Sequence, residues 1–211
     1  MTASPREQLP TLRGRQTQAA IDAAAKAVIA RKGILATTIS DIAAEAGKST
    51  ASFYNYYDSK EAMVREWAVR FRDEARQRSR AAAEPGLTNW ERSYQAAAAH
   101  WDTYRNRLAE IISVSQLAMV SDDFAQYWAD ICSLPTDLIT DMVKHAQRHG
   151  FCAIEDDAHL VAVAMVSMLN QFCYTRLSGD PASHSVDDDA CITTLANIFY
   201  RTIYHKEARL T

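Results

Sequence analysis

Hydroxyl, amide, phenol and ammonium groups are concentrated in the segment from Thr37 to Lys60, which reads TTISDIAAEAGKSTASFYNYYDSK. Groups of these types donate and accept hydrogen bonds at base edges and at phosphates, which is the chemistry of nucleic-acid recognition. The second half of the segment is too polar on its outer face to be a core element. We therefore predict a DNA-binding face that includes Thr50, Ala51, Ser52, Tyr54 and Asn55.

Two short helices separated by a tight turn would position these side chains. Thr38 and Asp41 have the spacing of a capping box, and apolar residues follow at helical intervals, so a first helix is predicted from Thr38. Gly47 can end that helix in a left-handed conformation, and Ser49 can cap a second helix through about Tyr56. The segment therefore predicts a helix-turn-helix.

The run TTI-x-x-IA-x-x-AG-x-S-x-x-S-x-Y-x-Y-Y-x-SKE resembles the DNA-binding signature of TetR-family transcriptional repressors. The resemblance covers roughly residues 15–65. Two positions depart from the family's pattern, because Lys48 stands where valine is usual and Tyr57 stands where phenylalanine is usual. The first departure bears on the DNA half-site, and the second on the packing of the turn.

The resemblance implies DNA contacts that are carried over by position. Thr38, at a helix N-terminus, and Lys60 match residues that bind phosphates. Tyr54 and Tyr56 match residues that contact the sugar-phosphate backbone. Three further residues of the second helix are expected at base edges: Thr50, Ala51 and Asn55.

Lys48 belongs to a Gly-Lys-Ser-Thr run, which also ends the Walker A motif. That motif requires a glycine where this chain has Ile42 inside a helix, and no strand precedes it, so NTP binding is not expected. Lys48 is expected either to meet a DNA phosphate or only to solvate the turn. The full predicted DNA-binding set is Thr38, Lys48, Ser49, Thr50, Ala51, Ser52, Tyr54, Asn55, Tyr56 and Lys60.

The composition favours an all-α protein with a charge that is divided along the chain. Of 211 residues, 48% are apolar, and only 6 Gly and 5 Pro interrupt the alanine-rich periodic segments. Residues 1–80 contain 14 basic against 9 acidic residues, or +5, and residues 81–211 contain 9 against 17, or −8. A basic module joined to an acidic remainder is typical of a DNA reader attached to a domain that does not bind DNA.

The periodicity predicts four regions. Residues 1–14 are a flexible arm, residues 15–58 a three-helix helix-turn-helix domain, residues 59–83 a connecting helix, and residues 84–211 a ligand-binding and dimerisation domain. Within the last region we expect helices over 88–104, 107–119, 122–149, 158–177 and 186–205, with Pro135 kinking or dividing the third. The last two helices have more apolar surface than one small domain readily covers, which favours a homodimeric four-helix interface, as the resemblance also implies.

Large apolar residues are concentrated in the connecting helix and in the region that follows it. Most could be plain core, but together they permit an apolar pocket for a lipophilic ligand, and the amide of Asn170 could orient that ligand. The stretch MVSMLNQFCY also resembles the corresponding helix of a mycobacterial family member. The predicted pocket residues are Trp67, Phe71, Trp101, Tyr104, Phe124, Trp128, Met142, Met168, Asn170 and Phe172.

Other chemistry has little support in the sequence. Asp141, His145 and His149 share a helix face, but they sit in a last helical turn and lack the H-E-x-x-H arrangement, so no metal is predicted. No catalytic motif is present, so no catalytic residue, cofactor or enzyme activity is expected. Four scattered cysteines without a C-x-x-C pair, and the lack of a signal or membrane-spanning run, favour the cytoplasm.

These observations lead to one hypothesis and one alternative from another class. The first is a ligand-responsive transcriptional regulator, most often a repressor in this family, that binds a palindromic DNA operator as a dimer and is released by a hydrophobic small molecule. The alternative is an all-helical ligand-binding or protein-interaction module without sequence-specific DNA binding. Only the first requires affinity that falls steeply with salt, because phosphate contacts release counterions.

Overall fold

The computed structural model describes residues 12–79, 86–153, 155–178 and 187–206. Within these ranges the chain is helical and forms no strand, so the all-α prediction is confirmed. The helices are, in order, α1 (Leu12–Lys32), α2 (Ile39–Glu45), α3 (Thr50–Tyr54), α4 (Lys60–Ser79), α5 (Asn89–Ala118), α6 (Asp122–Arg148), α7 (Ala158–Leu177) and α8 (Asp188–Ile203).

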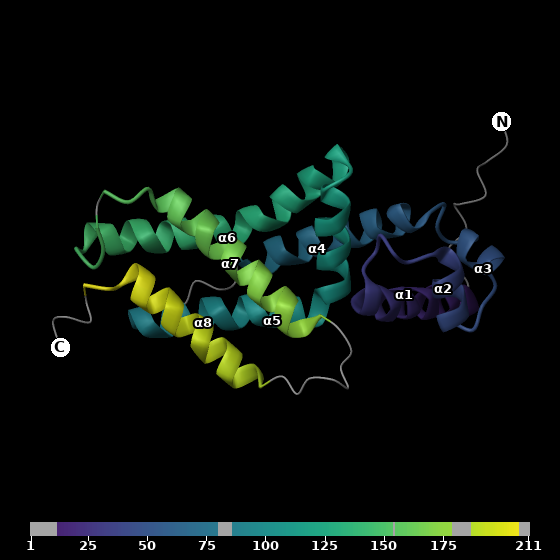
Figure 1. The fold of residues 1–211 in the computed structure, drawn as a ribbon, viewed down its shortest axis with the longest axis horizontal. Coiled ribbons are helices and arrows are strands. Elements are labelled where there is room, and N and C mark those ends of the chain that lie inside the picture. Colours follow the sequence, from purple (N-terminus) through teal and green to yellow (C-terminus); the bar gives the residue numbers. More distant parts are fainter. Residues whose placement is uncertain (1–11, 80–85, 154, 179–186, 207–211) are drawn as a thin grey trace.

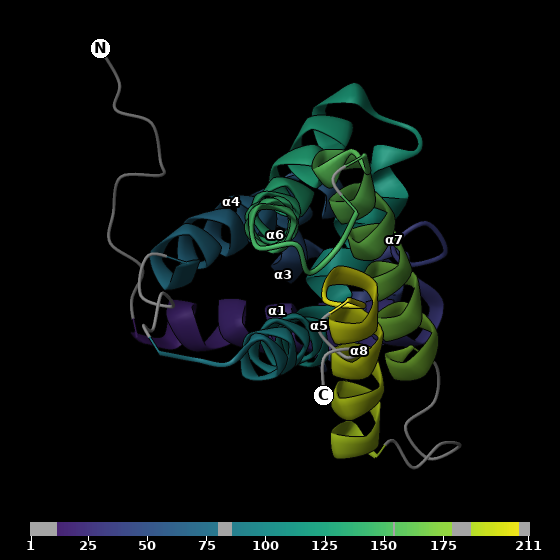
Figure 2. The ribbon, with the colours of Figure 1, turned by 90° about the vertical axis from the view of Figure 1, so that its left-hand side faces the viewer.

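The molecule is elongated, with its two groups of helices at opposite ends. Figure 1 shows α1, α2 and α3 together at one end, while α5 to α8 make up the larger part and α4 runs from one into the other. In Figure 2, α7 and α8 lie on the side of the molecule away from α4. α7 packs mainly on α6, and α8 packs mainly on α5.

Local capping interactions define the helix-turn-helix. The Thr38 hydroxyl accepts a hydrogen bond from the Asp41 backbone N–H at 3.1 Å, and the Asp41 carboxylate accepts one from the Thr38 N–H at 2.8 Å. Gly47 has a φ of +62° after α2, and the Ser49 hydroxyl accepts a bond from the Ser52 N–H at the start of α3. These caps and the turn confirm the predicted helix-turn-helix. It could be predicted from the sequence because each of these signals acts over only three or four residues.

Some helix boundaries differ from those expected. α1 begins at Leu12 rather than near Arg15, and the rest of the predicted arm, residues 1–11, lies outside the described residues, as do residues 80–83 of the connecting helix. The two helices expected between residues 88 and 119 are one helix, α5, whose backbone departs from helical geometry at Arg107 (φ −131°, ψ 23°). The expected break is therefore a kink.

Pro135 lies inside α6 and does not divide it. Proline has no N–H to donate to the preceding turn, which normally weakens a helix at this point. The hydroxyls of Thr136 and Thr140 donate to the carbonyl oxygens of Cys132 and Thr136, at 2.8 and 2.7 Å. These bonds lie in the turns around Pro135, and both threonines are buried.

Two apolar cores organise the fold. The first joins the helix-turn-helix to the larger domain and includes Ile21, Ile29, Ile34, Ile42, Phe53, Tyr57, Met63, Val64, Trp67, Ile112, Leu117 and Phe124. The second lies among α5 to α8, with Phe71 from α4, and includes Trp101, Tyr104, Ile139, Val143, Met165, Leu169, Cys173, Leu195 and Phe199. α4 therefore contributes to both cores, its first turns to one and Phe71 to the other.

Polar contacts also hold the two parts together. The Lys26 ammonium on α1 lies 2.6 Å from the Glu110 carboxylate on α5, whose side chain is 3% exposed. The same ammonium lies over the Trp67 ring, 5.5 Å from its centroid. Arg107, at the kink in α5, is 3.5 Å from the same Glu110 oxygen. Since a buried carboxylate needs such partners, these contacts resist separation of α1 from α5.

Candidate nucleic-acid interface

The outer face of α3 presents its polar side chains to solvent. Thr50, Ala51, Tyr54 and Asn55 are exposed, while Phe53 is fully buried in the first core. The Tyr54 ring is 55% exposed even though it contacts Phe53 edge to face. An exposed aromatic ring beside hydroxyl and amide groups suits a surface that contacts the sugar-phosphate backbone and base edges of DNA.

Helices α1 to α3 form the predicted DNA-binding part of the chain, here called the head. A groove of about 390 Å³ lies beside α3, between α3 and the start of α1. Lys48, Ser52 and Tyr56 line one side, and Arg13, Gly14 and Thr17 from the first turns of α1 line the other. Neither Arg13 nor Thr17 is in the predicted DNA-binding set: Arg13 falls in the predicted arm, and Thr17 falls in the predicted first helix. Their helical placement brings a second cation and a hydroxyl next to Lys48.

Two of the predicted phosphate ligands already have protein partners. The Lys60 ammonium donates to the carbonyl oxygens of Ile34 and Thr37, both at 2.8 Å, so it holds the turn between α1 and α2. The Thr38 hydroxyl donates to Asp41 at 2.6 Å. The roles of Lys60 and Thr38 at phosphates stay predictions, and each residue has a structural role besides.

Ion pairs on the first two helices shape the charge of the head. The Lys32 ammonium donates to Asp41 at 2.7 Å, and the Arg31 guanidinium donates to Glu45 at 2.7 Å. The bond from Lys32, followed by those from Thr38, holds the pKa of Asp41 well below its usual range. Because these cations are paired with carboxylates, they are less able to contribute to DNA affinity than Lys48.

The ten predicted pocket residues do not form one group. Trp67 and Phe124 belong to the first core, and Phe71, Trp101 and Tyr104 belong to the second. Trp128 touches both cores, Met142 and Phe172 pack at the edge of the second, and Met168 is 36% exposed. The predicted pocket residues of α4 are divided because its first turns, with Trp67, pack against α1, whereas Phe71 packs among the helices of the larger domain. The role of these residues in ligand binding stays a prediction.

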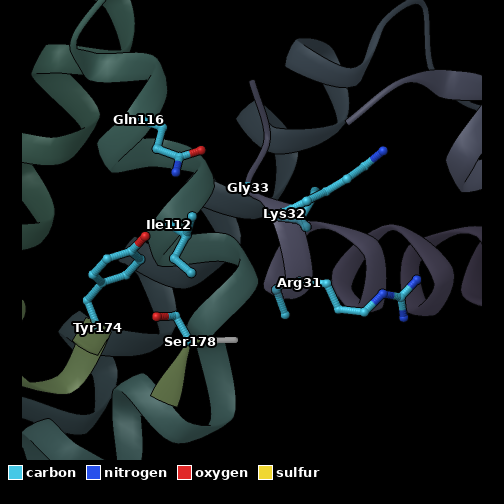
Figure 3. A pocket seen from close by; sticks show the side chains of 9 residues that line it. Arg31, Lys32, Gly33, Ile112, Gln116, Tyr174 and Ser178 are labelled. Atoms are coloured by element: carbon cyan, nitrogen blue, oxygen red, sulfur yellow. The ribbon is translucent and has the colours of Figure 1, made fainter. Parts of the chain in front are cut away.

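A surface pocket of about 280 Å³ marks the junction between the two parts (Figure 3). Arg31, Lys32 and Gly33 at the end of α1 line it together with Gln116 of α5, and Tyr174 and Ser178 complete it from the end of α7. The Gln116 side-chain oxygen accepts a hydrogen bond from the Ile34 N–H at 2.9 Å. Arg31 is paired with Glu45 and Lys32 with Asp41, so the described residues that line the pocket have no unpaired cation to offer to a ligand.

The histidines and cysteines form no metal site in the part of the chain that the structure describes. The His145 and His149 rings lie at the end of α6 with centroids 4.2 Å apart, and the His149 Nδ1, when it carries a proton, donates to the His145 carbonyl oxygen at 2.9 Å. Cys152, Cys173 and Cys191 are buried, Cys132 is half-buried, and all four are free thiols.

A model of the family described as bacterial regulatory proteins, tetR family, matches residues 21–67. The HTH-type transcriptional repressor KstR2 of Rhodococcus jostii (strain RHA1) is 30% identical over 145 residues, which cover 62% of this chain and 70% of that protein. The chain therefore belongs to the TetR family, as its helix-turn-helix predicted. It is a transcriptional regulator with a helix-turn-helix DNA-binding domain.

Solved structures share this fold over most of the chain. The ketosteroid transcriptional regulator KstR2 of Mycobacterium tuberculosis has a TM-score of 0.66 at 19% identity, covering 91% of this chain and 94% of that one. FadR from Bacillus subtilis, in complex with stearoyl-CoA, has a TM-score of 0.59 at 18% identity, covering 86% and 97%. At such identities the likeness shows the fold alone.

Proposed function

We propose that the protein is a ligand-responsive repressor of the cytoplasm that binds a palindromic operator as a homodimer and is released by a lipophilic small molecule. The observation that carries the proposal is the outer face of α3, where Tyr54 and Asn55 are exposed beside the cationic groove of Lys48 and Arg13. Hydroxyl and amide groups can read base edges in the major groove, while the cations contact the flanking phosphates.

The uncovered face of α7 supports the dimer. Between its two ends the exposed residues of α7 carry no charge: Leu160, Val163, Ala164, Ser167, Met168, Gln171, Tyr174 and Thr175. The exposed His159 and Arg176 lie in the first and last turns of the helix. By length and composition alone α7 could also cross a membrane, with a mean hydropathy of 1.2, but a helix of a protein core or interface passes the same test. A second copy of the chain would cover this face, and its two-fold symmetry would present two copies of α3 about 34 Å apart, one per half-site.

The apolar second core supports a lipophilic effector. The TetR-like FadR structure holds stearoyl-CoA, and KstR2 of Mycobacterium tuberculosis is named a ketosteroid regulator, so both names point to ligands with a large apolar part. In this chain an effector among α5, α6 and α7 would act on α3 through α4 and through the contacts of α1 with α5. Release requires different affinities for two conformations, commonly about 1–3 kcal/mol of coupling.

The first test is the salt dependence of DNA binding. The purified protein is used to select a sequence from random duplex DNA, and affinity for that duplex is measured by fluorescence anisotropy at several salt concentrations. We expect Lys48→Ala to lower the slope of log affinity against log salt by about 1, because one phosphate contact is lost. Asn55→Ala is expected to cost about 1–3 kcal/mol and to relax specificity at one base pair.

Lys144→Ala is the matched control, because Lys144 is exposed on the part of α6 that packs in the second core, away from the head. Lys60 is avoided, since its bonds to Ile34 and Thr37 make a loss of fold indistinguishable from a loss of DNA contact. A protein that selects no sequence and binds duplex DNA without salt dependence would instead support a helical ligand-binding or protein-interaction module.

A further inference from the structure

His100 on α5 places a buried ring nitrogen, Nε2, in the larger domain. Its Nε2 is buried and makes no hydrogen bond of good geometry to any described residue. The Asn170 side chain is nonetheless within hydrogen-bonding reach of the ring, and this interaction opposes the lowering of the His100 pKa by burial. Tyr104, one turn further along α5, stacks on the ring with centroids 5.3 Å apart. A buried polar group without a well-formed hydrogen bond is destabilising, so its presence requires an explanation.

Polar groups near His100 are also incompletely bonded. The Asn170 amide on α7 donates to the Cys132 thiol on α6 at 3.6 Å, and a thiol is a weak acceptor. The Trp101 indole N–H, next to His100 in the sequence, is buried and has no hydrogen-bond partner among the described residues. Three helices thus bring donors into one apolar core that offers them few acceptors.

This core offers no positive charge to a ligand. Burial lowers the pKa of His100 to about 4, so the imidazole is neutral at physiological pH and can donate or accept a hydrogen bond without carrying charge. Among the described residues that are buried, none is a lysine or arginine, and the buried carboxylate of Glu110 is paired at the junction. A carboxylate or phosphate placed beside His100 would lose its hydration without gaining an ionic partner.

We infer that the effector is a largely apolar molecule with an uncharged oxygen, a ketone carbonyl or a hydroxyl, and that His100 and Asn170 bind this oxygen between α5, α6 and α7. The inference rests on the proposed function, because it requires that an effector enters this core. A carbonyl oxygen would accept from the Asn170 amide and from Nε2 when that nitrogen is protonated. A hydroxyl would donate to Nε2 in the other tautomer.

The apolar part of such a molecule would contact the aromatic residues of the same core. Trp101 and Phe172 lie with ring centroids 6.2 Å apart, and Trp128 lies one turn before Cys132 on α6. Trp128 and Phe172 are half-buried, so part of each ring lies at the surface of the larger domain. Each additional apolar contact adds affinity in proportion to the surface removed from water.

The test compares ketones with carboxylates of similar size. Methyl octyl ketone is paired with decanoate, and cyclohexyl methyl ketone with cyclohexanecarboxylate, and binding is measured by quenching of tryptophan fluorescence. We expect the wild-type protein to bind at least one ketone about tenfold more tightly than its carboxylate partner, which corresponds to one satisfied buried hydrogen bond. A preference for the carboxylates, or binding of none of the four compounds, would overturn the inference.

His100→Phe separates a ligand contact from a structural role. Phenylalanine keeps a ring against Tyr104 but removes both nitrogens, so the free protein should melt at an equal or higher temperature while ketone affinity falls about tenfold. His100→Gln, which retains a donor and an acceptor, should recover part of the affinity. His149→Phe, at the exposed end of α6, is the control and should change neither quantity. Unchanged ketone affinity in His100→Phe would refute the assignment.

The same samples are titrated with the selected operator, so that two failures are distinguishable. Operator binding that persists while His100→Phe keeps its ketone affinity would overturn only the inference about the effector. Loss of operator binding in the wild-type protein itself would overturn the proposed function, whichever compound binds. A misfolded His100→Phe would be recognised by loss of operator binding, and the wild-type comparison of ketone with carboxylate would still decide the question.

Discussion

At the scale of single residues, Tyr57 shows how a departure from the family pattern is accommodated. Its ring is buried in the first core, where phenylalanine would also fit, but its hydroxyl donates to the Asp22 carboxylate on α1 at 2.7 Å. The same oxygen accepts from the Gln18 amide at 3.1 Å. Burial, and then the bond to Asp22, raises the pKa of Tyr57 far above its usual value, so the phenol stays protonated. The extra hydroxyl therefore ties the end of α3 to α1.

Tyr57→Phe should lower the free energy of unfolding by about 1–2 kcal/mol, because the lost bond involves a charged acceptor that is partly shielded from water. Urea denaturation followed by circular dichroism measures this loss. Tyr54→Phe is the matched control, since the Tyr54 ring is 55% exposed, and it should leave stability unchanged. Equal stability of Tyr57→Phe and the wild-type protein would mean that the hydroxyl only replaces contacts with water.

At the scale of elements, the turn between α1 and α2 is the point where the DNA-binding head meets the larger domain. Gly33 has a φ of +75°, and a Cβ added there would lie 2.6 Å from the Gln116 side-chain oxygen. That oxygen is needed for the bond from the Ile34 N–H, and Lys60 holds the Ile34 carbonyl from the other side. The turn is thus fixed by α5 and by the first residue of α4. Movement of either helix would therefore shift the turn and, with it, the start of α2.

Gly33→Ala should destabilise the protein more than Gly47→Ala, although both substitutions place alanine at a positive φ. Gly47 has a φ of +62° with nothing within 4 Å of an added Cβ, so its cost is backbone strain of about 1–2 kcal/mol. Gly33→Ala adds the collision with Gln116 to a similar strain. Thermal unfolding of both variants measures the difference. Equal losses would show that the turn can move away from α5 at no cost.

At the scale of the whole molecule, the distribution of charge and of uncovered apolar surface separates two functions. The head carries the cationic groove, and α7, at the side away from α4 in Figure 2, carries an exposed face that is uncharged from Leu160 to Thr175. Exposed Ile198 on α8 adds to the apolar surface of the larger domain. DNA and a second subunit would therefore be bound at different surfaces of the molecule.

Val163→Glu should convert the proposed dimer to a monomer, because a dimer would bury two unpaired carboxylates at this face. Light scattering after gel filtration should give a mass near the 23.6 kDa of one chain instead of twice that value. Operator affinity should fall in parallel, since one half-site contact is lost. Ala129→Glu adds the same charge at an exposed position of α6 and should remain dimeric. A dimeric Val163→Glu would place the interface elsewhere.

The all-helical class, the helix-turn-helix and most helix ends could be predicted from the sequence, because caps such as Thr38 with Asp41 and breakers such as Gly47 act over three or four residues. The exposed positions of α3 followed from the same local pattern. The kink at Arg107 was also indicated locally, although its size was not.

Tertiary structure alone decided which distant groups meet. It divided most of the apolar residues of the predicted pocket between two cores, gave Lys60 two carbonyl partners in the α1–α2 turn, and brought His100, Cys132 and Asn170 together from three helices. Helical periodicity assigns a residue to a face, but the direction in which that face points depends on crossing angles and rotations set by the packing of all the helices. The buried nitrogen of His100, which lacks a well-formed hydrogen bond, could be recognised only after that packing was known.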